Sequence, residues 1–206
     1  IPDEYSRYGS FTELYEQNLD KLKSIVDEAS ATTSTKGSVA QQIGDFYKSG
    51  MDTATIEAAG ITPLNADFEA ISAISNNSDL ASAIGKYQRM GAYPVFYPFS
   101  GQDKKNTDIV LFQLNQGGLG LPDRDYYVQD DARSKELRAA YQDYIRDMLI
   151  ISGDDDVEAQ KKAQQILALE TQLAKASFTR KENRDPEATY TKTDLDGLKK
   201  MAPSFD

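Results

Sequence analysis

The sequence contains no histidine and no cysteine among its 206 residues. Without an imidazole, neither a Ser-His-Asp nor a Cys-His arrangement can take up a proton near neutral pH. Structural zinc sites use thiolate and imidazole ligands, and catalytic zinc sites almost always use histidine. A metal ion held by this chain would therefore be a hard cation such as calcium or magnesium, bound through oxygen. The absence of disulfides leaves the cellular compartment open.

Charge and hydropathy exclude two further classes of partner. The chain has 33 acidic and 23 basic residues, a formal net charge of −10, so it lacks the basic surface that nucleic-acid binding requires. No apolar run reaches the roughly 18 residues of a transmembrane helix. The opening residues, IPDEYSRYGSF, contain neither the basic nor the apolar region of a signal peptide and no initiator methionine. We therefore expect a processed or engineered boundary upstream.

Apolar residues that recur at helical spacing predict a mainly α, multi-helical lobe of about eight helices. Capping residues are predicted at Ser10 (with Glu13), Thr62, Ser78 and Thr193. The helices are expected over about 11–30, 39–50, 53–59, 63–75, 79–90, 132–151, 154–176 and 194–201.

One β-hairpin is predicted within this helical pattern, at about 95–114. The segments VFYPF (95–99) and DIVLFQL (108–114) are rich in β-branched and aromatic residues and flank the polar turn GQDKKN. Pro98 favours an edge position for the first strand.

The GGLGLP segment at 117–122 is the first candidate site, because glycines that follow a strand can cradle phosphate. A P-loop would end in GK[ST], and a dinucleotide fingerprint would have glycine where Asp123 stands. The carboxylate of Asp123 would also repel a phosphate. We therefore predict a tight turn between a strand and the next helix, with Pro122 beginning that helix.

Acidic and aromatic residues offer three weaker candidates. Asp154–Asp156 lack the alternating spacing of a calcium loop, and a helix N-terminus explains them better. The 33 acidic residues allow many carboxylate pairs of the kind used in glycoside hydrolysis, but nothing marks one pair as special. Aromatic residues gather at 93–99 and at Tyr126 and Tyr127. They can form a carbohydrate or peptide platform, although packing in cores and interfaces is their more frequent use.

Four stretches, in one order and at one spacing, resemble the N-terminal part of the neprilysin-type zinc endopeptidases, which include endothelin-converting enzymes and bacterial oligopeptidases. The third is the most specific, because it is similar to the family pattern GLGLP-x-[RK]-x-YY. The resemblance covers nearly the whole chain, about 1–206. The stretches are IPDEYSRYGSF at 1–11, DFYKSGMDTATIEAAGITPL at 45–64, QGGLGLPDRDYY at 116–127, and ALETQLAKAS with RKENRDPEATY at 168–190.

The resemblance implies a two-lobed metallopeptidase that hydrolyses oligopeptides. Its zinc would be held by an HExxH motif and a downstream glutamate in a catalytic lobe outside this chain, so this chain itself is expected to bind no cofactor and to be inactive alone. Residues 1–10 would be a crossing segment near the catalytic lobe. Residues 11–206 would be an incomplete helical lobe that encloses the chamber and restricts substrate size. The implied partners are the C-terminal catalytic part of the same protein and an oligopeptide substrate.

Arg7 is the one site residue that the resemblance implies, and no catalytic or metal-binding residue is expected in this chain. In members with an S-R-[YW]-G opening, this arginine lines the primed side of the site and can meet the free carboxylate of a short substrate. A guanidinium binds a carboxylate through two parallel hydrogen bonds. The alternative for Arg7 is a salt bridge between the lobes.

The sequence differs from the family pattern at one position, and two alternative functions stay open. Gly50 stands where many animal members have cysteine, so the disulfide of those members is absent here, and the cysteine-free composition favours a bacterial-type member. Such a protein is expected to be exported as a periplasmic, cell-surface lipoprotein or secreted protein, with the cytoplasm left open. The rival functions are a stand-alone helical module that binds peptides or proteins, and a family member whose zinc motif has decayed.

Overall fold

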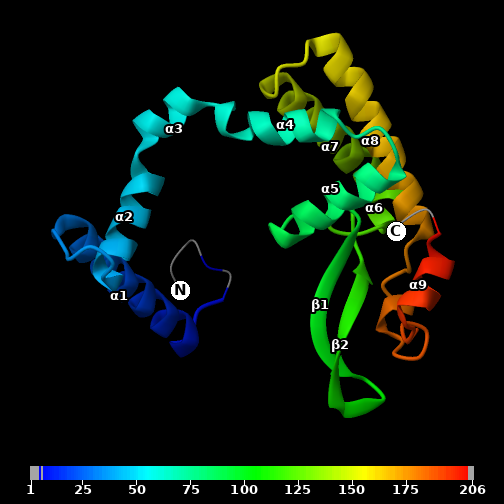
Figure 1. Ribbon diagram of the computed structural model, residues 1–206, viewed down its shortest axis with the longest axis horizontal. Coiled ribbons are helices and arrows are strands. Elements are labelled where there is room, and N and C mark those ends of the chain that lie inside the picture. The colour runs from blue at the N-terminus through cyan, green and yellow to red at the C-terminus, as the bar shows by residue number, and fades with distance from the viewer. Residues whose placement is uncertain (1–4, 6, 204–206) are drawn as a thin grey trace. The chain divides into compact units, whose positions relative to one another are not determined.

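The computed structural model describes Tyr5 and residues 7–203, which form helices and one hairpin (Figure 1). This confirms the predicted fold class. The chain separates into two compact units, Ile1–Pro63 and Leu64–Asp206. The elements are α1 (Ser10–Ala31), α2 (Val39–Met51), α3 (Thr53–Ala59), a 3₁₀ turn (Thr62–Leu64), α4 (Asn65–Ser72), α5 (Asn77–Arg89), β1 (Phe96–Asp103), β2 (Asn106–Gln116), α6 (Asp125–Val128), α7 (Ala132–Ile151), α8 (Asp156–Ala176), a 3₁₀ turn (Glu182–Arg184) and α9 (Leu195–Met201).

The first unit consists of α1 and α2, packed against each other, and the short α3. The side chain of Ser38 caps α2 by accepting a hydrogen bond from the backbone nitrogen of Gln41 at 3.2 Å. The two helices approach closely at Gly44, where a Cβ atom would lie 2.4 Å from the carbonyl oxygen of Ala29. No residue of α1 is buried, and Phe11 is almost fully exposed. The apolar stripe of α1 is therefore largely uncovered within its own unit.

The second unit is built on the two long helices α7 and α8, which pack against each other and against α6. Ala159 and Ala163, one turn apart on α8, are fully buried. Side chains this small allow a neighbouring helix to approach closely. Gly153, with a φ of +108°, lies in the turn between α7 and α8. Such a positive φ favours glycine, which explains why α7 ends where the sequence predicted.

The strands β1 and β2 pair antiparallel, from Phe96 opposite Gln116 to Gln102 opposite Val110. The predicted hairpin is confirmed, and the strands are slightly longer than expected. They continue into the predicted turn, because the carboxylate of Asp103 accepts a hydrogen bond from the backbone nitrogen of Lys105 at 2.9 Å and so tightens the turn. The hairpin projects away from α7 and α8 (Figure 1).

The four predicted helix caps are wrong by one or two residues. At α5 the side chain of Asn76 accepts a hydrogen bond from the backbone nitrogen of Asp79 at 3.0 Å. At α9 the side chain of Asp194 does the same for Gly197 at 2.8 Å. Asparagine and aspartate cap at least as well as serine and threonine, so several polar residues in a row leave the position open. The observed N-caps are Gly9, Leu64, Asn76 and Asp194, in place of Ser10, Thr62, Ser78 and Thr193.

Candidate functional site

The glycine loop, residues 117–122, joins β2 to α6, which confirms the predicted turn. The helix begins at Asp125 rather than at Pro122. Gly118 has a φ of +78°, and a Cβ atom on Gly120 would lie 1.8 Å from the hydroxyl oxygen of Tyr141. Backbone conformation and close packing therefore account for these glycines.

Glu170, on α8, is the centre of the hydrogen bonds that hold the glycine loop. Its Oε2 accepts from the Tyr127 hydroxyl at 2.5 Å and from the Gly120 nitrogen at 3.2 Å, and its Oε1 accepts from the Tyr141 hydroxyl at 2.9 Å. The Tyr127 hydroxyl also accepts from the Leu121 nitrogen at 2.8 Å. Burial, and then the bond to Glu170, raises the pKa of both tyrosines. Side chains from α6, α7 and α8 thus fix the loop.

The two residues that follow the glycine loop are held by charge. Asp123 pairs with Arg180 and accepts a hydrogen bond from the backbone nitrogen of Asp125 at 2.8 Å. Burial alone would raise the pKa of Asp123, but these two hydrogen bonds outweigh it, so the pKa lies below its usual value. Arg124 donates through Nε to the carbonyl oxygen of Ala174 at 3.0 Å. A cation is favourable there, because the C-terminal end of a helix such as α8 carries partial negative charge.

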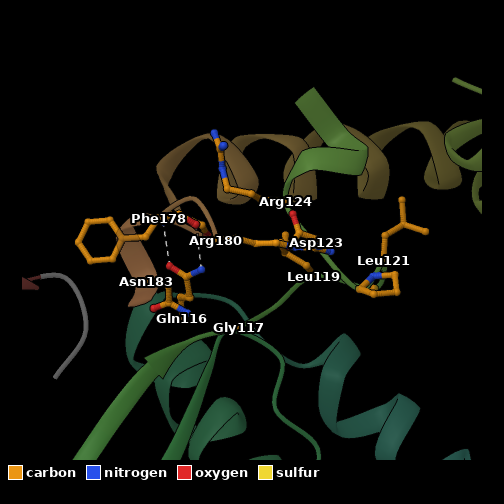
Figure 2. A pocket seen from close by; sticks show the side chains of 12 residues that line it. Gln116, Gly117, Leu119, Leu121, Asp123, Arg124, Phe178, Arg180 and Asn183 are labelled. Carbon is orange, nitrogen blue, oxygen red and sulfur yellow. Dashed lines mark hydrogen bonds and ion pairs between the residues drawn. The ribbon is translucent and has the colours of Figure 1, made fainter. Parts of the chain in front are cut away.

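A cleft of about 350 Å³ lies between the glycine loop and the segment after α8. Figure 2 shows how Gln116, at the end of β2, bridges to this segment: its side-chain amide donates to the Phe178 carbonyl at 3.2 Å and accepts from the Phe178 nitrogen at 2.8 Å. The hydroxyl of Ser177 donates to the Leu173 carbonyl at 2.9 Å, a backbone oxygen and not a side-chain base. The cleft can therefore bind a polar group, but its side chains do not form a nucleophile–base pair.

A second polar cluster ties the tip of the hairpin to the segment that leads into α9. Asp103 is only 2% exposed. It accepts hydrogen bonds from the Lys192 ammonium at 2.7 Å and the Tyr190 hydroxyl at 2.8 Å. The bond from Lys192 is the main reason that the pKa of Asp103 is lowered to about 2. The ammonium of Lys105 pairs with Glu187 at 2.6 Å in the same cluster.

The acidic run Asp154–Asp156 lies at the N-terminus of α8, as predicted. The side chain of Asp155 accepts a hydrogen bond from the Glu158 nitrogen at 2.9 Å. The other two carboxylates pair with Lys162 and Arg146. All three acidic side chains are therefore used within the fold.

Arg7 is exposed and lies in a bend before α1. Residues 1–4 and 6 of the predicted crossing segment lie outside the described residues. The hydroxyl of Tyr8 donates to Glu16 at 2.7 Å, and this bond is the main reason that the pKa of Tyr8 is raised to about 12. The start of α1 is thus held by a local contact, whereas the role of Arg7 stays a prediction.

The part of the chain that the structure describes contains no group of three acidic side chains arranged to hold a metal ion. Since histidine and cysteine are missing from the sequence, the donors present here do not fit a zinc site. No catalytic step is therefore assigned to a metal held by this chain. Over the same described residues, no helix is both long enough and apolar enough to cross a membrane.

Sequence reasoning missed the roles of Glu170 and Asp103. Glu170 stands in ALETQLAKAS, one of the four stretches that resemble the family, and this position could have marked it as a residue with a role. Asp103 was assigned to a polar turn, and its partner Lys192 lies 89 residues away. Nothing in the local pattern connects these two residues.

Comparison with known proteins places the chain in a family. The model of the N-terminal part of peptidase family M13 matches residues 1–206. Endothelin-converting enzyme 1 of Mus musculus is 30% identical over the whole chain, which covers 27% of that protein. The open-state structure of the Mycobacterium tuberculosis zinc metalloprotease Zmp1 is 30% identical, with a TM-score of 0.91, and the chain covers 32% of it.

A more distant structure shares the fold. PepO from Lactobacillus rhamnosis HN001 is 17% identical over the whole chain, with a TM-score of 0.77. The chain spans about a third or less of the length of each of these proteins. Because the family model covers the chain from end to end, this chain belongs to peptidase family M13, the neprilysin-type zinc endopeptidases.

Proposed function

We propose that this chain is the N-terminal helical part of a zinc-dependent endopeptidase that hydrolyses oligopeptides. The observation that carries the proposal is the family match over residues 1–206, together with relatives of which the chain covers only 27% to 32%. The donors in this chain do not fit zinc, so the metal and the catalytic residues are assigned to a C-terminal part of the same polypeptide. This chain would contribute enclosure and binding.

The enclosing role is supported by the architecture of the chain. Residues 11–206 would act as part of a helical lobe that walls a chamber and admits only chains thin enough to enter it. The long helices α7 and α8 suit this role, because they pack against each other and close packing between helices resists deformation. Residues 1–10 would cross toward the catalytic part. We also propose export from the cytoplasm, which fractionation of the producing cells would test.

The decisive experiment measures peptide hydrolysis by the complete gene product beside this 206-residue chain, with and without a zinc chelator. We expect only the complete product to cleave, and the chelator to abolish cleavage. A complete product that binds one zinc per chain without cleaving any of a peptide library is evidence for a catalytically dead member. A complete product that binds no zinc favours a stand-alone binding module and overturns the proposal.

We further propose that Arg7 binds the free carboxylate at the end of a short peptide substrate. Its exposure and its place before α1 are compatible with this role. In the complete enzyme, Arg7→Ala is expected to raise KM by about tenfold or more, because a charge-assisted bond contributes roughly 1.5–3 kcal/mol. Peptides with an amidated C-terminus should show no such change. An unchanged KM for free-carboxylate peptides would favour an interlobe salt bridge instead.

A further inference from the structure

Three apolar side chains on one face of β2 are exposed. Antiparallel pairing places directly opposed residues on the same face, and the register sets Pro98 opposite Leu114 and Ser100 opposite Phe112. The side chains of Val110, Phe112 and Leu114 therefore share this face of β2, and they are 67%, 70% and 41% exposed. We call these three residues the hairpin face.

The opposite face of β2 is also apolar, but it is partly covered. Ile109 and Leu111 point to that side, and both are half-buried. A strand with one wet face alternates polar and apolar residues, whereas a strand covered on both faces reads as a continuous apolar run. The run IVLF, residues 109–112, has the second pattern. The sequence of β2 is thus suited to burial on both sides, and the structure covers only one.

A hairpin of only two strands also needs such a cover. Two-stranded sheets are at best marginally stable in water, and they gain stability by packing against another element. Contiguous exposed apolar side chains are typical of a surface that another part of a protein covers. A partner that covers the hairpin face would therefore add to the stability of the hairpin.

We infer that the hairpin face docks onto an apolar surface of the C-terminal part of the same polypeptide. This inference rests on the proposed function, in which that part exists. The chain covers only 32% of Zmp1, so about two thirds of a protein of that length would be available to supply the surface. A second copy of the chain is a poorer occupant, since each copy carries a net charge of −10 and copies repel one another.

Thiol labelling tests this docking directly, because the chain has no cysteine of its own. Phe112→Cys is expected to react rapidly in the 206-residue chain. In the complete gene product it should react at least ~100-fold more slowly, with the labelled position identified by peptide mass spectrometry. Val157→Cys, on α8 and 81% exposed, is the matched control for reagent access in the 206-residue chain. Fast labelling of Phe112→Cys in both proteins overturns the inference.

Two other occupants give different results in the same assay. Slow labelling of Phe112→Cys in the 206-residue chain at every concentration means that the chain's own residues cover the face. Labelling that slows only as the chain concentration rises, with a dimer in sedimentation, means that a second copy does so. Either result overturns the inference.

A charge substitution provides the second readout. Val110→Glu with Phe112→Glu should lower the Tm of the complete product by at least about 5 °C and leave the Tm of the 206-residue chain unchanged. Phe112→Leu, which keeps an apolar side chain, should change neither. An unchanged Tm in the complete product would count against docking. Both readouts are independent of peptide cleavage, so a complete product that fails to cleave overturns the proposed function without affecting this test.

Discussion

At the scale of single residues, Glu170 is the acceptor for two tyrosine hydroxyls and a loop nitrogen. Glu170→Ala leaves the hydroxyl of the buried Tyr127 without an acceptor, so we expect the free energy of unfolding to fall by about 1–3 kcal/mol. Glu170→Gln keeps one carbonyl oxygen and should lose less. Urea denaturation of the 206-residue chain measures both. Glu136→Ala, exposed on α7, is the control and should stay within about 0.5 kcal/mol of wild type. If both Glu170 variants match this control, the carboxylate does not hold the loop.

The carboxylate of Asp103 makes a pH-dependent contribution to stability. Its bonds from Lys192 and Tyr190 require the charged form, and its pKa in the folded chain is about 2. A depressed carboxyl pKa stabilises the folded state above the ordinary pKa near ~3.9, and this contribution is lost as the pH falls through the folded value. We therefore expect attachment of the hairpin tip to weaken between about pH 4 and pH 2.

The Asp103 prediction is checked by comparing wild type with Asp103→Asn. The difference in unfolding free energy between the two should shrink as the pH falls across that window. Amide hydrogen exchange near Tyr190 should show the same trend locally. A difference that stays constant from pH 5 to pH 2 would mean that the charge of Asp103 does not hold the segment leading into α9.

At the scale of elements, the sequence predicts long helices whose apolar residues repeat at helical spacing, and it misses the limits of short helices and the contacts between distant segments. α7 begins and ends where its apolar spacing and Gly153 indicate, because a long amphipathic stripe repeats its signal over several turns. The helix after the glycine loop was predicted to begin at Pro122, but α6 begins at Asp125, because four residues are too few to show a period that would fix its start. The glycine loop was located correctly. Its anchor Glu170 lies 50 residues from Gly120, and a contact between distant segments leaves no trace in local spacing.

The glycine loop depends on a missing side chain at Gly120. Gly120→Ala would place a Cβ atom 1.8 Å from the Tyr141 hydroxyl oxygen, so either the loop or α7 must shift. We expect a loss of about 1–3 kcal/mol in unfolding free energy, measured in urea. Gly50→Ala is the matched control: Gly50 lies inside α2 with open space around it, and alanine should stabilise that helix by up to about 1 kcal/mol. A Gly120→Ala variant as stable as wild type would show that the loop is not tightly packed against Tyr141.

At the scale of the whole molecule, few hydrophobic side chains among the described residues are buried for a chain of 206 residues. A chain of that length ordinarily removes most of its apolar surface from water. Here large apolar side chains on α1, α2 and β2 are exposed, which fits a part of a larger protein better than an independent domain. Among the described residues, the buried hydrophobic side chains are Ile84, Tyr127, Ile145, Ala159, Ala163 and Ala174.

This balance leads to a prediction about the chain in isolation. The 206-residue chain is expected to bind an apolar fluorescent dye more strongly, per mole, than the complete gene product, because the C-terminal part would cover surfaces such as α1 and the hairpin face. Its urea m-value should also fall below that typical of its length, since m scales with the surface exposed on unfolding. Equal and low dye binding by the two proteins, with an ordinary m-value, would show that this chain buries its apolar faces by itself. This chain would then be an autonomous domain, and its contact with the proposed C-terminal part would have to be polar.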